Sequence, residues 1–263
     1  FRVNIFRQRG SISIVMRVVP FRVLSVEDLR LPPVVSTLAA EERGIVLVTG
    51  TTGSGKSTTL AAMIDRINRT AHKHVVTIED PIEMLHVDRG SLVNQREVGL
   101  DTESFSSALR RVLRQDPDVI MIGEIRDLVT METALSAAET GHLVFSTLHT
   151  IDATETVNRI VDFFPPHQQA QARLSLATSL RGVVSQRLVR RAHGEGRVPA
   201  VEILVNTGRV FERIVDPDAP GDSIEEIMAD GEFYGMQTFD QALLALHRSG
   251  TVSLREAMAA ATS

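Results

Sequence analysis

Cysteine and tryptophan are absent from this chain of 263 residues, which contains a single tyrosine. The absence of cysteine excludes disulfides and thiolate metal sites, and it fits a reducing compartment such as the cytosol. No apolar run approaches the roughly 20 residues that a helix needs to span a bilayer. The composition therefore predicts a chain without a membrane span and without thiol chemistry.

A basic excess is also missing, because the net charge is −5 and the isoelectric point is near 5.9. No global positive field favours nucleic acid or an anionic membrane, so we expect no direct nucleic-acid partner. The chain has no initial Met and no signal sequence, and it begins at Phe1 inside an expected strand. We therefore expect the natural N-terminal portion to extend further upstream.

Strand and helix signals alternate along most of the chain. Segments 1–6 and 12–19 alternate apolar and polar residues around Arg9-Gly10, which predicts a β-hairpin. Further strands are expected at 45–49, 74–78, 118–122, 143–147, 186–190 and 199–205. Helices are expected at 34–41, 57–69, 104–115, 128–140, 152–162 and 167–184. This order predicts an α/β fold with a mainly parallel sheet and helices on both faces.

The last quarter of the chain reads differently, as short helices broken by Pro, Gly and Asp. These helices are expected at 207–214, 222–230, 236–248 and 253–261. We therefore expect three parts: an N-terminal piece with its linker at 1–32, an α/β core at 33–206 and a small helical subdomain at 207–263.

The most specific motif is a P-loop, G-x-x-x-x-G-K-[ST], between an expected buried strand and an expected helix. Its residues are Gly50, Thr51, Thr52, Gly53, Ser54, Gly55, Lys56, Ser57 and Thr58. Its glycines let successive backbone N–H groups point at a phosphate, and the following helix N-terminus adds partial positive charge. Lys56 would reach the β- and γ-phosphates, and Ser57 would hold Mg²⁺. The motif predicts binding of a nucleoside triphosphate.

Acids follow two of the other expected strands. Glu124 ends the run 119–122 after Gly123, the position at which an Asp is usual, and it could bind Mg²⁺ through water or orient an attacking water. Glu79, Asp80 and Glu83 end the strand 74–78, where a bound cation would offset their mutual repulsion. The alternatives are a Glu that caps the next turn and a solvated acidic turn.

Histidines lie at both ends of the expected strand 143–147. His149 would emerge at the carboxyl end, level with Glu124 and the P-loop, where an imidazole can contact the γ-phosphate. His142 lies at the far end, where a structural role is as good an interpretation. Arg2, Arg9 and Arg17 in the hairpin are candidates for an arginine supplied across a subunit boundary, with ordinary surface arginines as the alternative.

Together these segments resemble the type IV pilus and type II secretion ATPases. VTGTTGSGKSTT is similar to the Walker A motif of that family, TIEDPIE to its Asp box, DPDVIMIGEIRD to its Walker B motif and GHLVFSTLHT to its His box. LVNQREVG and GMQTFDQALL resemble the pilus retraction, or twitching motility, ATPases of the PilT and PilU type. The missing cysteines also differ from the paired-CxxC zinc site typical of extension and secretion ATPases.

The resemblance implies a RecA-like P-loop core, with FRVNIFRQRG as part of a truncated PAS-like N-terminal α/β domain. It implies Mg²⁺-dependent ATP hydrolysis, with Glu83 and Glu124 as the governing acids, Ser57 and Glu124 at the metal, and His149 and His142 as His-box residues. It also implies a homohexameric ring on the inner face of the cytoplasmic membrane, acting on a platform protein of the pilus machine.

Other functions remain open at this point. The stretch from Gly208 to Pro217 is a poor match to the AIRNLIRE-like helix of retraction ATPases. An extension, secretion or conjugation ATPase of the same superfamily is therefore one alternative. A nucleotide-binding switch with slow turnover is another, and a phosphotransferase is disfavoured because no acceptor-binding lid can be identified.

Overall fold

The computed structural model describes residues 1–19 and 22–262, apart from the side chain of Arg2. Seven strands form one sheet in the order β5-β4-β6-β7-β3-β8-β9. Their bounds are β3 Gly44–Thr49, β4 His74–Glu79, β5 Leu92–Glu97, β6 Val119–Ile122, β7 Leu143–Leu148, β8 Leu180–Arg190 and β9 Arg197–Val205. All neighbours are parallel except β8 and β9, so the expected mainly parallel sheet is confirmed.

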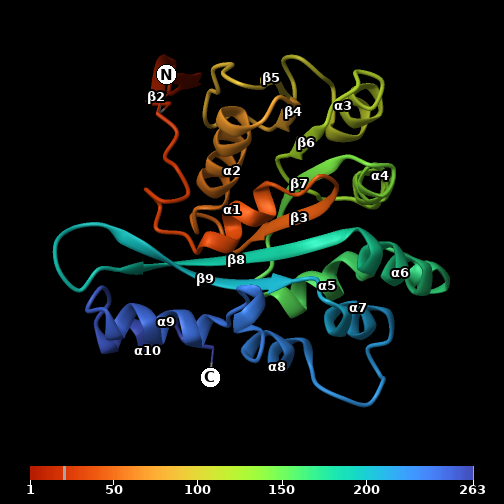
Figure 1. Cartoon of the computed structure of the whole chain (residues 1–263). Coiled ribbons are helices and arrows are strands. Elements are labelled where there is room, and N and C mark those ends of the chain that lie inside the picture. The colour runs from red at the N-terminus through yellow and green to blue at the C-terminus, as the bar shows by residue number, and fades with distance from the viewer. Residues whose placement is uncertain (20–21, 263) are drawn as a thin grey trace.

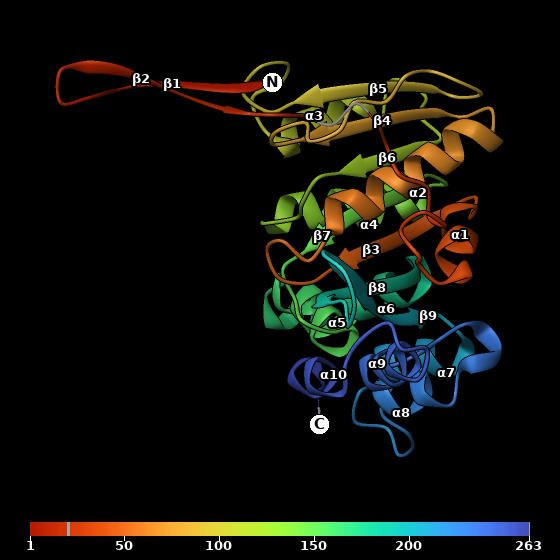
Figure 2. The same cartoon turned by 90° about the vertical axis from the view of Figure 1, so that its left-hand side faces the viewer.

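Helices cover both faces of this sheet (Figures 1 and 2). On one face lie α1 Pro33–Ala39 and α2 Lys56–Thr70, and on the other lie α3 Phe105–Val112, α4 Leu128–Glu139, α5 Ala153–Asp162 and α6 Gln169–Ser179. The central strand β3 serves both layers, since Ile45 and Leu47 pack into one cluster and Val46 and Val48 into the other. A strand buried on both faces reads as a continuous apolar run, which is why it was predictable.

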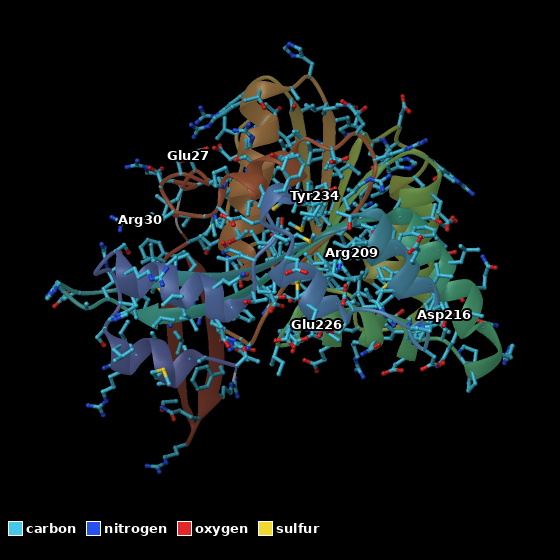
Figure 3. The ribbon with its side chains drawn as sticks, turned by 60° about the horizontal axis from the view of Figure 1, so that its bottom comes forward. Glu27, Arg30, Arg209, Asp216, Glu226 and Tyr234 are labelled. Atoms are coloured by element: carbon cyan, nitrogen blue, oxygen red, sulfur yellow. The ribbon has the colours of Figure 1, made fainter. Side chains whose placement is uncertain are left out.

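The C-terminal helices lie beside the antiparallel end of the sheet (Figure 1). They are α7 Gly208–Val215, α8 Ile224–Ala229, α9 Phe239–Arg248 and α10 Leu254–Ala260, and short 3₁₀ helices occur at Pro166–Gln168 and Glu232–Tyr234. Capping boxes at Ser223 and Thr238 start α8 and α9. Figure 3 views this part from below, with Arg209, Asp216 and Glu226 labelled. The division into three domains stays a proposal.

The N-terminal hairpin pairs β1 Arg2–Gln8 with β2 Ser11–Arg17, as expected, and projects from the rest of the chain (Figure 2). Its two-residue turn places Arg9 and Gly10 at φ 46° and 83°, the left-handed geometry that matches strand twist in tight hairpins.

Two predictions of secondary structure were wrong. The helix expected to run to residue 184 ends at Ser179, and β8 begins at Leu180. A Cβ at Gly182 would lie 2.8 Å from the carbonyl oxygen of Leu204, so this glycine marks a close approach of β9 rather than a helix interior. The edge strand β5 was not predicted at all, because its sequence LVNQRE has neither an apolar run nor strict alternation.

Candidate functional site

A cavity of about 750 Å³ lies at the carboxyl ends of four neighbouring parallel strands, β3, β4, β6 and β7. Ligands of open α/β sheets bind at this edge. Its lining includes Thr52, Gly53, Gly55, Lys56, Ser57, Thr58, Glu83, Glu124, His149, Arg17, Arg126 and Arg197. The structure thus brings together the P-loop, both predicted acids and one of the two predicted histidines.

The P-loop is shaped by its glycines. Gly55 is left-handed, with φ 100°, immediately before the first residue of α2. A Cβ at Gly50 would lie only 2.5 Å from the carbonyl oxygen of Gln186, so no other residue fits there without displacing β8. On the far side of the loop, the Gln186 side chain donates a hydrogen bond of 2.8 Å to Thr59 Oγ1 and fixes the first turn of α2.

Lys56 lies folded into the loop that carries it. Its Nζ donates to the carbonyl oxygens of Gly50 and Thr51 at 2.8 and 3.1 Å. Burial lowers the pKa of its ammonium, while the negative charges of Glu124 and Glu83 oppose this shift. The lysine is therefore pre-positioned at the loop, and both acids lie close enough to influence it.

Glu124 sits between two basic side chains. It pairs with Arg126, and its Oε2 lies 3.4 Å from His149 Nε2. The hydrogen bond from Arg126 to Glu124 raises the pKa of the guanidinium. Because Glu124 is largely buried while its two partners are about half exposed or more, they hold its carboxylate at the cavity wall.

Gly123 occupies the position after β6 at which an Asp is usual, and the acid of this chain, Glu124, comes one residue later. Its N–H donates to the carbonyl oxygen of Ile78 at 2.8 Å, which brings the β6 exit close against β4. A Cβ at this position would lie 3.2 Å from that same oxygen, tighter than ordinary contacts. Glycine therefore suits the usual Asp position, and Glu124, one residue on, reaches the cavity instead.

Both Glu79 and Glu83 line the cavity; Glu83 lies in the loop after β4, and Glu79 is buried at the end of that strand. Glu79 accepts hydrogen bonds from Thr77 Oγ1 at 2.7 Å and from Gln95 Nε2 at 3.0 Å. Burial raises the pKa of Glu79, and the two hydrogen bonds oppose that rise. Glu79 is thus held by neighbouring side chains of β4 and β5, and Glu83 remains the acid that faces Lys56.

Comparison with known proteins assigns this arrangement to a family. Residues 1–227 match the family model described as "Type II/IV secretion system protein". The chain is 48% identical over 257 residues to a Pseudomonas aeruginosa protein named "Type IV pilus retractation ATPase PilT". The alignment covers 98% of the chain and 74% of that protein. It is 43% identical over 263 residues to "Type IV pilus ATPase PilU" of the same organism, covering 100% of the chain and 68% of that protein.

A solved structure supports the same assignment. "Crystal Structure of the Pilus Retraction Motor PilT and Bound ADP" superposes with a TM-score of 0.91 at 48% identity, covering 100% of this chain and 74% of that one. The chain belongs to the type II/IV secretion system protein family. Within this family it is a P-loop ATPase of the pilus retraction type, which confirms the resemblance seen in its motifs.

Of the other residues predicted for this retraction-type ATPase, Arg17 lies at the cavity, whereas His142 and Arg9 are not part of its lining. His142 lies at the opposite end of β7 from His149, and its Nδ1 is 3.0 Å from the carbonyl oxygen of Ala137. Arg17 lines the cavity of its own chain, whereas Arg9 lies at the hairpin turn. The Arg2 backbone pairs with Arg17 in the hairpin, but its side chain lies outside the described residues.

Arg197 was missed from the sequence. It begins β9 after a glycine-containing turn, and the antiparallel return of β9 along β8 brings it beside the P-loop residues Ser57 and Thr58. It also lines a second cavity of about 310 Å³, together with Leu24, Leu29, Arg30 and Arg191. The β8–β9 hairpin and the pairing of β8 with β3 place this arginine at the cavity, far in sequence from the P-loop.

The residues at the ATPase site fit a Mg²⁺–nucleotide. The Ser54 hydroxyl is buried in the P-loop without a hydrogen-bond partner, and a Cβ at Gly53 would meet nothing within 4 Å. Among the described residues, no group of three or more His, Asp or Glu could hold a metal on its own.

The helix that departs from the retraction motif is α7 of this ATPase. Val210 and Ile214 are fully buried, so its apolar face is committed to the core. Arg209 pairs with Asp222, and Arg213 donates to the carbonyl oxygens of Pro217 and Ala219 at 3.0 and 2.8 Å. The two arginines stabilise the loop that follows the helix.

No helix of the described residues is long and apolar enough to cross a bilayer.

Proposed function

We propose that the protein works as a hexameric ring that couples Mg²⁺-dependent ATP hydrolysis to retraction of a type IV pilus. The proposal rests on one observation: a single cavity is lined by Lys56, Glu83, Glu124 and His149. The printed names of its relatives, PilT and PilU, supply the pilus as the load. Loss of fibre retraction in a deletion strain, restored by this protein, would support retraction, whereas a strain that stops making fibres would indicate an extension motor.

The P-loop holds the phosphates in this proposal. Backbone N–H groups of residues 53–58 point at the β-phosphate, and Lys56 leaves its loop carbonyls to neutralise the γ-phosphate. The smaller cavity shares Gly55, Thr58 and Arg197 with the larger one, which supports the proposal that it would hold the base and ribose of ATP. Ser57 supplies the hydroxyl ligand for Mg²⁺, which when bound neutralises charge that develops on the phosphates.

Glu124 orients the attacking water from the opposite wall. Arg126 and His149 fix its carboxylate, so it points at the cavity rather than at solvent. In-line attack on a phosphoryl group needs little covalent help from the protein, so positioning and charge account for most of the catalysis. The negative charges of Glu124 and Glu83 oppose the lowering of the Lys56 pKa that burial causes, so both acids favour the charged ammonium.

The two histidines of β7 provide a matched test of this site. His149→Ala should lower kcat about 10- to 100-fold, because Glu124 loses one of its two basic partners. His142→Ala should leave kcat within about twofold, because His142 contacts Ala137 at the other end of the strand. Steady-state phosphate release measures both. Equal losses in the two variants would contradict a catalytic role for His149.

Assembly into a ring accounts for an exposed apolar face on the hairpin. Ile5 and Ile14 are register partners on one face, and Ile12 and Met16 lie beside them, all more than half exposed. An isolated two-stranded hairpin is marginally stable at best, so this face needs a covering surface. We propose that a neighbouring copy of the chain supplies it and that Arg17 lies near this boundary.

Light scattering with and without ATP tests the assembly. Ile14→Asp should shift the mass from six chains towards one, because it places a charge on the apolar face. Ser13→Asp, one residue earlier on the opposite face, should keep the mass of six. Hexamers of the Ile14→Asp variant would exclude this face as the contact.

Location and partner follow from this role. We propose that the ring acts in the cytoplasm, at the inner face of the cytoplasmic membrane, on a membrane-embedded platform protein of the pilus machine. Co-purification of the ring with the platform protein tests this, and a ring that never sediments with platform-containing membranes would oppose it.

A further inference from the structure

Glu202 is a buried carboxyl group with no assigned role. It lies in β9, only 5% exposed, and its Oε1 accepts a hydrogen bond of 2.7 Å from the backbone N–H of Ala153. Ala153 is the first residue of α5, where N–H groups have no partner within the helix. An acid from a distant strand therefore completes the cap of this helix, next to the Asp152 side chain that caps Glu155.

The helix that Glu202 caps begins just after the hydrolytic site. Only residues 150–152 separate His149 from Ala153. Thr150 is held by a hydroxyl–hydroxyl contact of 2.6 Å to Thr156, and the Ile151 N–H donates to Glu155 at 2.7 Å. Both contacts tie the turn to α5, so we expect a displacement of Ala153 to displace His149 as well.

Glu202 also belongs to a row of side chains beneath the P-loop. Thr49, Ser185 and Glu202 are successive register partners across β3, β8 and β9. The Thr49 hydroxyl donates to the Ser185 hydroxyl at 2.9 Å, directly before the P-loop begins. The same row thus supports both loops of the site.

The strand on either side of Glu202 is bonded to the C-terminal segment. Ile203 and Gln237 exchange backbone hydrogen bonds of 2.8 and 3.2 Å, and the Gln237 side chain donates to the carbonyl oxygen of Val201 at 2.7 Å. Gln237 directly precedes the N-cap of α9. A movement of the C-terminal helices would therefore be transmitted to Val201 and Ile203, the residues that flank Glu202.

We propose that Glu202 is a positioning residue of the hydrolytic site, whose carboxyl holds the segment from His149 to Ala153 and ties it to the C-terminal helices. The inference rests on the role proposed above for His149. Glu202 is not part of the lining of either cavity, and it acts on Glu124 through the position of His149.

The charge state of Glu202 provides a readout that a merely structural residue lacks. Burial raises the pKa of Glu202 to about 7, against the opposing hydrogen bond from Ala153. Asp152 at the N-cap of α5 and Glu225 of α8 favour its protonated form, and Arg187 of β8 favours the carboxylate. The carboxylate binds the positive end of α5 more firmly than the neutral acid does, so the turn is held best above neutral pH.

Three variants test the inference in the intact protein. Glu202→Met removes the acceptor and should lower kcat about tenfold with the KM for ATP within about twofold, since the P-loop is untouched. Glu202→Gln keeps an acceptor without charge, so its kcat should stay level between pH 6 and 8, where the wild-type kcat rises. Glu225→Gln, the exposed control, should retain the rise but shift it towards lower pH, because the charge of Glu225 raises the pKa of Glu202.

A double-mutant cycle with His149→Ala identifies the route of the effect. If Glu202 acts through His149, the double variant with Glu202→Met is no slower than His149→Ala alone. Additive losses would overturn the inference, as would a wild-type kcat for Glu202→Met or a wild-type pH profile for Glu202→Gln.

Failure of the inference can be told apart from failure of the proposed function. A wild-type rate for His149→Ala would refute the role of His149 and this inference with it. A slow His149→Ala beside a fast Glu202→Met would overturn only the inference. Should Glu202→Met fail to fold, the pH profile of the near-isosteric Glu202→Gln decides.

Discussion

Replacing Lys56 with alanine should lower ATP hydrolysis at least about 100-fold, to the background of the assay, because the γ-phosphate loses its fixed positive charge. The structure explains the size of this effect, since Lys56 is buried in the P-loop and the carbonyl oxygens of Gly50 and Thr51 hold its ammonium there. ATP affinity should fall as well, because the same ammonium contacts the bound phosphates.

The chain offers a matched control for this variant, since it contains only one other lysine, Lys73. Lys73 pairs with Glu42 at 2.8 Å, away from the cavity lining. Lys73→Ala should therefore keep the wild-type rate. Phosphate release by Lys56→Ala at more than a tenth of the wild-type rate would show that the P-loop is not the hydrolytic site.

The second large effect is expected from Glu124→Gln, with a loss of about 100- to 1,000-fold in kcat and little change in ATP affinity. The amide keeps the size of the side chain but cannot accept a proton or hold Arg126 by charge. Binding of a fluorescent ATP analogue and single-turnover hydrolysis separate the two quantities.

This variant also discriminates between a motor and a slow nucleotide switch. A switch would keep most of its already low turnover after Glu124→Gln, whereas a motor loses it. Glu132→Gln, an exposed acid on α4, controls for loss of one negative charge and should behave like the wild type. If Glu124→Gln bound ATP more weakly, Glu124 would be a nucleotide-binding residue and not the residue that orients the attacking water.

The nucleotide site was largely predictable because its motifs are local. The P-loop is a continuous run, and the placement of Glu124 and His149 follows from their positions at the carboxyl ends of parallel strands. The same reasoning separated His142 from His149, since opposite ends of one strand cannot face one cavity. What these residues do in catalysis stays a prediction until the variants are measured.

The remaining residues depend on contacts between distant segments. Gln186 and Arg197 reach the P-loop only because β8 continues from α6 as a strand and β9 returns beside it, and the sequence pattern favoured a longer helix there. The carboxyl of Glu202 caps a helix that begins 49 residues earlier. Such pairings leave no periodic signal in either segment, so neither could be identified from local patterns.

Steady-state phosphate release by the purified protein, measured in Mg²⁺ and then with excess EDTA, distinguishes a hydrolytic motor from a nucleotide-binding switch. We expect each chain to hydrolyse many ATP molecules in Mg²⁺, to fall to background rates after chelation, and to recover when Mg²⁺ is restored. Tight ATP binding with no more than one phosphate released per chain would contradict a hydrolytic motor and leave a nucleotide-binding switch.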